Sequence, residues 1–235
     1  MRTAASFAGL LATLAMATGC VSANRISATT PMNPTSQTAE PPAIPPTAQT
    51  LVVGGGCFWC IEPLFEQLKG VYDVESGYAG GQQAGVTYDQ VTSGRSGHAE
   101  VIKISFDPAA IKRDDLLRIF LSSHDPTTKD RQGNDVGTQY RSVIFFANPE
   151  EKALAERIIA ELTSEGLFDK PIVTTIEELK NYTRAEEYHQ DYYAKFEQAS
   201  PEERARMNAG YCTYVITPKI AEFRKKFSHL FKDSE

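Results

Sequence analysis

Hydrophobic positions after residue 50 switch between two spacings, which predicts strands mixed with helices. An unbroken apolar run at 51–53 favours a short buried strand. The next apolar positions are three or four residues apart, as on one face of a helix: Ile61, Leu64, Phe65 and Leu68. Gly70 is a natural stop for that helix. We therefore expect the strand to lead directly into the helix.

The same two patterns recur to the end of the chain. Alternating apolar positions at 101–106 predict a strand with one buried face, and compact apolar runs predict strands at 142–147 and 172–176. Helical spacing predicts three further helices, one around 116–121, one from Asn148 through Leu162 and one from Thr217 through Leu230. This irregular order of strands and helices predicts an α+β layered domain. No internal repeat or second boundary interrupts it, so residues 51–235 are expected to form a single catalytic domain.

The N-terminus carries an export signal. Residues 7–17 are apolar but too few to span a bilayer, and they follow a positively charged start, as in a signal peptide. The sequence ATGC at 17–20 resembles a bacterial lipoprotein signal, which makes 1–19 the signal peptide and Cys20 the lipidated residue. The alternative is ordinary cleavage after 21–23, which removes Cys20. Either way we expect an exported protein in the bacterial periplasm or cell envelope.

A Pro/Thr/Ala-rich segment follows at residues 20–50. Six of the 13 prolines lie between 26 and 50, where Glu40 is the only charge and no aromatic residue is present. Such a composition cannot bury enough apolar surface to offset the entropy of ordering. We expect a disordered tether that keeps the domain near a membrane only through its lipid anchor.

Charge and cysteine number exclude several classes of protein. The formal net charge of −6 argues against nucleic-acid binding, which needs a concentrated basic face. Without Cys20 the mature chain keeps Cys57, Cys60 and Cys212, an odd number that does not suit a structural disulfide framework. Cys212 stands alone, unlike the paired ligands of structural zinc sites, so we expect no metal.

Two thiols stand three residues apart at the predicted strand-to-helix junction, where residues 54–60 read GGGCFWC. A cysteine at the start of a helix meets the positive end of its dipole, which favours the thiolate. Pro63 fits best in a first turn, so the helix is expected to begin close to Cys60, with Cys57 just outside it. Cys57 is therefore the predicted nucleophile.

The chain resembles the A-type peptide-methionine sulfoxide reductases. The resemblance begins with GGCFWC at 55–60 and Glu62, and it continues in the family's order through GYAGG at 77–81, Tyr88, SGRSGHAE at 93–100, HDP at 124–126, RQGNDVGTQYRS at 131–142, YHQDY at 188–192 and GYC at 210–212. It implies a two-layer α/β sandwich with a mixed sheet and a ferredoxin-like core. It also implies thiol-dependent reduction of the S epimer of methionine sulfoxide, free or in proteins, without a metal or organic cofactor.

The chemistry needs a proton donor beside the nucleophile, because a sulfoxide oxygen leaves only when it is protonated or strongly hydrogen-bonded. By the resemblance this acid is Glu100, whose pKa must then be raised by burial above its free value of about 4.3. Tyr88 and Tyr140 match the phenols that bind the same oxygen, and Asp135 matches a residue that positions the site. Without the resemblance, Glu100 would be interpreted as a solvated strand-edge residue and both tyrosines as core-edge residues.

The aromatic residues inside the thiol motif receive a role in the same way. Phe58 and Trp59 match the hydrophobic pocket for the substrate methyl group, although packing alone would also explain them. Three histidines, His98, His124 and His189, are expected to be structural residues with satisfied hydrogen bonds.

The thiol that closes the cycle is ambiguous. Attack leaves Cys57 as a sulfenic acid, which a second thiol condenses to a disulfide. Cys212 falls where the family often carries its resolving cysteine, and we favour it, but Cys60 can act as direct resolver or as a relay. The resemblance implies that a thioredoxin-like protein reduces the final disulfide, and we expect a monomer.

Two other classes fit part of the sequence. A thioredoxin-like thiol–disulfide oxidoreductase would use the CxxC at 57–60, but it has no need of Glu100, Tyr88 and Tyr140. A non-catalytic lipoprotein that binds oxidised methionine in partner proteins would need the aromatic pocket and not the thiols.

Overall fold

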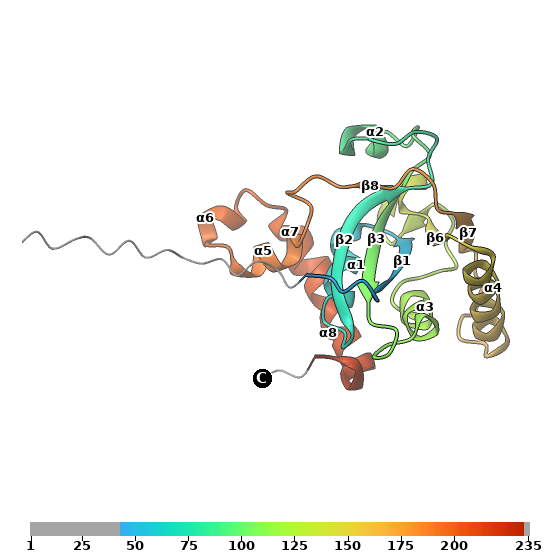
Figure 1. Cartoon of the computed structure of the whole chain (residues 1–235). Coiled ribbons are helices and arrows are strands. Elements are labelled where there is room, and N and C mark those ends of the chain that lie inside the picture. The colour runs from blue at the N-terminus through green and yellow to red at the C-terminus, as the bar shows by residue number, and fades with distance from the viewer. Residues whose placement is uncertain (1–42, 233–235) are drawn as a thin grey trace, which may run out of the picture. The chain divides into compact units, whose positions relative to one another are not determined.

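Six strands form one mixed sheet in the computed structural model, which describes residues 43–232. Their order across the sheet is β7-β6-β1-β3-β2-β8 (Figure 1). Within this sheet β6 and β7 run parallel and the other neighbouring pairs are antiparallel. The strands are β1 (Gln49–Gly55), β2 (Val71–Ala79), β3 (Ala99–Phe106), β6 (Ser142–Phe146), β7 (Thr175–Glu178) and β8 (Thr183–Arg184). A separate hairpin pairs β4 (Arg131–Gln132) with β5 (Asp135–Val136).

Three helices cover one face of the sheet. They are α1 (Phe58–Phe65), α3 (Arg113–Ser122) and α4 (Pro149–Ser164). Along the chain, β1-α1-β2-β3-α3-β6 has the βαββαβ order of a ferredoxin-like core, and its strands lie side by side as β6-β1-β3-β2. The predicted α+β sandwich with a mixed sheet is therefore confirmed.

The remaining helical elements are shorter or C-terminal. They are α2 (Tyr88–Thr92), a 3-10 turn (Thr138–Tyr140), α5 (Tyr192–Gln198), α6 (Pro201–Arg204), α7 (Ala209–Tyr211), a π-helical segment (Cys212–Ile216), α8 (Thr217–Phe227) and a final 3-10 turn (Ser228–Leu230). Among the described residues, none of the helices is long and apolar enough to cross a membrane.

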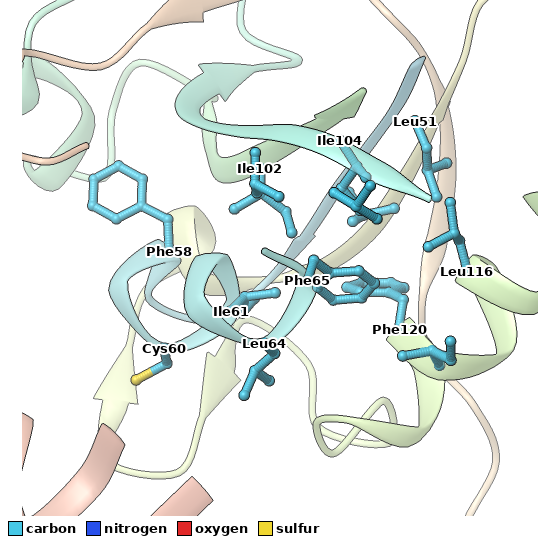
Figure 2. Packing of buried hydrophobic residues seen from close by; sticks show 14 of the residues in the cluster. Leu51, Phe58, Cys60, Ile61, Leu64, Phe65, Ile102, Ile104, Leu116 and Phe120 are labelled. Atoms are coloured by element: carbon cyan, nitrogen blue, oxygen red, sulfur yellow. The ribbon is translucent and has the colours of Figure 1, made fainter. Parts of the chain in front are cut away.

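The core lies between the sheet and α1. Alternate residues of β3, such as Ile102 and Ile104, point toward the helices and are fully buried against Ile61 and Phe65 of α1 (Figure 2). The opposite face carries a smaller apolar cluster that includes Val101. Because Glu100 has the same parity as Ile102, its carboxyl also points to the helical side, toward the start of α1.

The start of the domain differs slightly from the prediction. β1 begins at Gln49, so the last two residues of the predicted tether belong to the sheet, where Gln49 and Thr50 pair with Phe106 and Ser105. The predicted signal peptide at 1–19, the predicted lipidation site Cys20 and the tether up to residue 42 lie outside the described residues.

The first helix corrects one expectation. It begins at Phe58, two residues earlier than predicted, and Pro63 lies inside it rather than in its first turn. Pro63 is the sixth residue of the helix, where a proline removes the hydrogen bond to the carbonyl of Trp59. Cys57 is the N-cap, outside the helix as expected. Gly70 does not end the helix as predicted, because α1 ends at Phe65; with a φ of 83° it lies directly before β2.

Several strands depart from the sequence pattern, and the two-residue strands β4, β5 and β8 were not predicted. β2 was not predicted, because a register shift between Val71 and Asp73 breaks the alternation of its apolar residues. β7 spans Thr175–Glu178, three residues later than the predicted 172–176. The last helix starts at Thr217 as predicted, but Leu230 lies in a separate 3-10 turn after it.

Candidate active site

The loop between β1 and α1 presents Cys57 to the site. Gly56 has a φ of 102°, and a Cβ there would lie 2.7 Å from the Cβ of Gln132, so only glycine fits this close approach. Cys57 is partly buried at the N-cap of α1. Burial, the hydrogen bond with Cys60 and the charge of Glu100 raise its pKa well above the usual value. Burial thus acts against the thiolate that the helix dipole favours.

Cys60 belongs to a chain of three polar groups. Its Sγ lies 3.1 Å from the hydroxyl of Tyr211, which donates to Oδ2 of Asp135 over 2.7 Å. Because the phenol proton goes to Asp135, the thiol of Cys60 is the donor to Tyr211. The side chain leaves α1 on the side away from the sheet (Figure 2). The hydrogen bond with Cys57 lowers the pKa of Cys60, against the effect of burial, and Lys219 and Tyr211 lower it further.

Glu100 lies directly behind the nucleophile. Its Oε2 accepts the backbone N–H of Phe58 over 3.1 Å, and the residue is 1% exposed. Burial raises the pKa of its carboxyl to about 8, although that hydrogen bond opposes the shift. At neutral pH the carboxyl is therefore mostly protonated, as an acid beside Cys57 must be.

The phenols of Tyr88 and Tyr140 are both influenced by the charges of Glu100 and Cys57. Tyr88 is the first residue of α2, and Tyr140 ends the 3-10 turn after β5. Burial raises the pKa of Tyr88 to about 12 and that of Tyr140 further, and the charges of Glu100 and Cys57 act in the same direction on both. Both hydroxyls therefore remain protonated and can donate hydrogen bonds.

Aromatic residues surround the indole of Trp59. Tyr192 stacks on it with ring centroids 3.8 Å apart and an interplanar angle of 7°, and Tyr211 meets it edge-on. The indole N–H donates to Nδ1 of His189 over 3.1 Å, which fixes the ring in its plane. Phe58 is fully buried and packs against His189 with centroids 4.9 Å apart. These contacts form a rigid apolar wall next to Cys57.

Cys212 lies at the start of the π-helical segment that follows α7. It is fully buried, and burial followed by the charge of Cys60 raises its pKa to about 11. Cys212 directly follows Tyr211, whose phenol contacts Cys60. Cys212 therefore lies nearer to Cys60 than a residue remote from Tyr211 would. The structure thus brings every predicted domain residue of the site into one region.

The three histidines differ in their contacts. His124 donates from Nδ1 to the carbonyl of Phe120 and accepts at Nε2 from Ser142, over 2.8 and 2.7 Å, and burial lowers its pKa to about 4. His189 accepts from Trp59, and so it supports the aromatic wall rather than the core alone. His98 is buried against Gly81, where a Cβ would lie 2.0 Å from its Nδ1.

A cavity of about 610 Å³ lies beside the two thiols. Its lining includes Cys57, Cys60, Asp135, Tyr211 and Lys219. Within residues 43–232 no group of three or more His, Cys, Asp or Glu side chains is arranged to hold a metal ion.

Sequence reasoning missed the partners of the motif residues. Tyr211 and Tyr192 stood in the quoted stretches 210–212 and 188–192 without a role. The available signal was that Tyr211 directly precedes Cys212 and that Tyr192 follows His189 by three residues. Lys219 gave no signal, because a lysine near a helix start is common on protein surfaces.

A cysteine at a helix N-cap, a protonated carboxylic acid behind it and phenols around it define an enzyme with a thiol nucleophile and a general acid. A family model described as peptide methionine sulfoxide reductase matches residues 49–230. The chain is 50% identical over 182 residues to a peptide methionine sulfoxide reductase of Chromobacterium violaceum, covering 77% of this chain and 98% of that one. It is 48% identical over 178 residues to one of Trichodesmium erythraeum, covering 76% and 95%.

Solved structures agree with these relatives. Reduced Mxr1 from Saccharomyces cerevisiae superposes with a TM-score of 0.60 at 33% identity, covering 66% of this chain and 90% of that chain. Methionine sulfoxide reductase A of Corynebacterium diphtheriae gives 0.58 at 34% identity, covering 66% and 78%. The chain therefore belongs to the peptide methionine sulfoxide reductase family, a class of enzymes that reduce methionine sulfoxide.

Proposed function

We propose that the protein reduces the S epimer of methionine sulfoxide, free or in proteins, with Cys57 as nucleophile and Glu100 as acid. The observation that carries this proposal is the contact between the buried Glu100 carboxyl and the amide of Phe58, the residue after Cys57. It supports a role for Glu100 as a protonated acid beside the sulfoxide oxygen when Cys57 attacks sulfur. Tyr88 and Tyr140 bind the same oxygen, and Phe58 and Trp59 hold the methyl group.

The first step oxidises the nucleophile. The thiol proton of Cys57 is released, its sulfur attacks the sulfoxide, and the oxygen takes the proton of Glu100 as it passes to Cys57. The products are methionine and the Cys57 sulfenic acid, and Glu100 regains a proton from water. The raised pKa of Cys57 keeps the thiol unreactive until a sulfoxide occupies the pocket.

The purified protein with dithiothreitol should reduce the S epimer of methionine sulfoxide and leave the R epimer unchanged. The two epimers differ in which side of sulfur carries oxygen and which carries methyl, and only one can meet Glu100 and the aromatic wall together. Chromatographic measurement of methionine from each epimer tests this. Equal rates for both epimers, or none for the S epimer, would refute the assignment.

Resolution of the sulfenic acid involves both remaining thiols. The backbone hydrogen bond from Cys60 to Cys57 places the two residues in one turn at the start of α1, which supports Cys60 for the first disulfide, whereas the sequence favours Cys212. The burial of Cys212 beside the Cys60 end supports it as the second thiol, which attacks the Cys60 sulfur and releases Cys57 as a thiol. A thioredoxin-like protein then reduces the Cys60–Cys212 disulfide.

After one turnover without reductant, peptide mapping should find Cys60 linked to Cys212 in the unaltered protein. In Cys212→Ser the relay stops one step earlier, so the map should show Cys57 linked to Cys60. The Cys60→Ser variant is the matched control. A Cys57–Cys212 link in the unaltered protein, with Cys60 free, would contradict the relay and support direct resolution by Cys212.

The N-terminal sequence supports a proposal about location. An apolar stretch at 7–17 followed by Cys20 and the proline-rich segment fits an exported, lipid-anchored protein of the periplasm or cell envelope that repairs oxidised exported proteins. A mature N-terminus other than lipidated Cys20, found by mass spectrometry, would contradict the anchor.

A further inference from the structure

A partly buried lysine that the reaction above does not use lies close to the two thiols. Lys219 is the third residue of α8, and it lines the 610 Å³ cavity together with Cys57 and Cys60. This lysine of the C-terminal helix thus faces the same cavity as the two cysteines at the start of α1, more than 150 residues earlier in the chain. A lysine side chain held at such a place loses hydration, which must be offset by a negative partner.

The cavity contains other titratable groups besides Lys219. His124 is uncharged at neutral pH, since its pKa falls to about 4, and Lys226 donates to the carbonyl of Ser122 over 3.2 Å. Glu222 is one turn along α8 from Lys219, and Asp135 accepts the phenol of Tyr211.

We propose that Lys219 is a positioning residue that holds Cys60 as the thiolate which closes the first disulfide with oxidised Cys57. The inference rests on the proposed function, because it concerns the step after the sulfenic acid has formed. In the relay, Cys60 attacks oxidised Cys57 and is then attacked by Cys212. The fraction of Cys60 that is ionised therefore sets how fast the sulfenic acid is removed.

The step balances with groups already described. The Cys60 thiolate attacks the Cys57 sulfur, the S–S bond forms and the S–O bond breaks. The leaving oxygen, which carries its own hydrogen, takes a proton from Glu100 and departs as water, and Glu100 is reprotonated from solvent. No other oxidant or reductant enters, since the two electrons come from the Cys60 sulfur.

The electrostatics of the thiol pair agree with this role. The pKa of Cys60 is lowered while that of Cys57 is raised, so Cys60 ionises first. Lys219 lowers the pKa of Cys60, and Tyr211 does so by donating its phenol proton to the ionised sulfur in place of Asp135, whereas burial and Asp135 raise it. Conversely, burial lowers the pKa of Lys219, and the charges of Cys60, Cys57, Asp135 and Glu222 oppose that shift. The lysine and the thiols therefore stabilise each other's charged forms.

The first test measures ionisation directly. In a Cys20→Ser, Cys57→Ser, Cys212→Ser background, Cys60 is the one remaining cysteine, and ultraviolet absorbance of the thiolate reports its titration. Lys219→Met should raise the pKa of Cys60 by about one unit or more, because a nearby opposite charge is removed. Lys219→Arg should restore it. Lys226→Met is the matched control, with the same substitution on the same helix and cavity, and should leave the titration in place.

The second test separates the two steps of the first turnover. With all three cysteines present, Lys219→Met should slow disulfide closure at neutral pH about tenfold relative to methionine formation, because the thiolate fraction falls tenfold per unit of pKa. An unshifted Cys60 pKa in Lys219→Met, or an equal rise in Lys219→Arg, would overturn the role of the lysine charge. A protein that forms no methionine at all would instead refute the proposed function.

Discussion

Replacement of Cys57 by serine is expected to lower sulfoxide reduction by at least about 10⁴-fold. The reason is redox chemistry as well as nucleophilicity, because the attacking atom must itself lose two electrons and carry the oxygen away as a sulfenic acid. A serine hydroxyl cannot be oxidised in this way. The size difference is small, and Cys57 makes no side-chain capping hydrogen bond to α1, so the variant should fold normally.

The matched control for this variant is Cys60→Ser, the same substitution three residues along. It should still form one methionine per protein molecule in a single turnover, because the attacking thiol remains. Quantification of methionine without added reductant distinguishes the two variants. Turnover by Cys57→Ser at more than a trace would show that another thiol attacks the substrate, and it would overturn the assignment of the nucleophile.

Glu100→Gln is expected to slow methionine formation by about 10² to 10⁴-fold, the usual contribution of a general acid. Glutamine keeps the shape and can still accept the N–H of Phe58, but it cannot deliver a proton. The reactive form of the natural pair carries one proton, with Cys57 as thiolate and Glu100 as acid. Its population rises with pH through the first ionisation of the pair, near the Glu100 pKa of about 8, and falls after the second.

The pH profile of single-turnover rates tests that assignment. The unaltered protein should show a rising limb, a maximum above pH 8 and a falling limb, whereas Glu100→Gln should rise with thiolate formation and show no falling limb. A profile of the same shape in both proteins, or an unchanged rate, would refute the acid role.

The thermal stability of Glu100→Gln provides a control for its loss of activity. The pKa of Glu100 is raised in the folded protein, so the folded state holds more protons between about pH 4.5 and 8 and loses stability as pH rises through this range. Glutamine removes that cost. Glu100→Gln should therefore melt at a higher temperature than the unaltered protein at pH 8, and lost activity would not reflect unfolding.

The sequence predicted those parts of the fold that are determined by residues close together along the chain. The run at 51–53, the glycines and the spaced apolar residues after Cys60 were enough to place Cys57 at the head of a helix. β2 was missed because its bulge disturbs the period on which strand prediction depends. The C-terminal segment from Tyr192 to Ile216 was missed because short helical pieces are set by tertiary contacts, such as the stacking of Tyr192 on Trp59, and not by periodicity.

The candidate site also has a part that the sequence predicts and a part that depends on long-range packing. The resemblance named Cys57, Glu100 and the tyrosines, and the structure gathers them. The sign of the Cys57 pKa shift could not be predicted, because the dipole is a local property whereas burial depends on Glu100 and the distant C-terminal segment. The roles of Tyr211 and Lys219 depend in the same way on long-range packing against α1.

The packing around Trp59 also determines the intrinsic fluorescence of the protein. It is the only tryptophan of the chain, it lies between the two thiols in sequence, and its indole is fixed by Tyr192 and His189. Intrinsic fluorescence excited through indole therefore arises entirely inside the active site, where sulfur in its different oxidation states quenches to different degrees. Oxidation of the neighbouring cysteines is therefore expected to change the indole emission, without any attached dye.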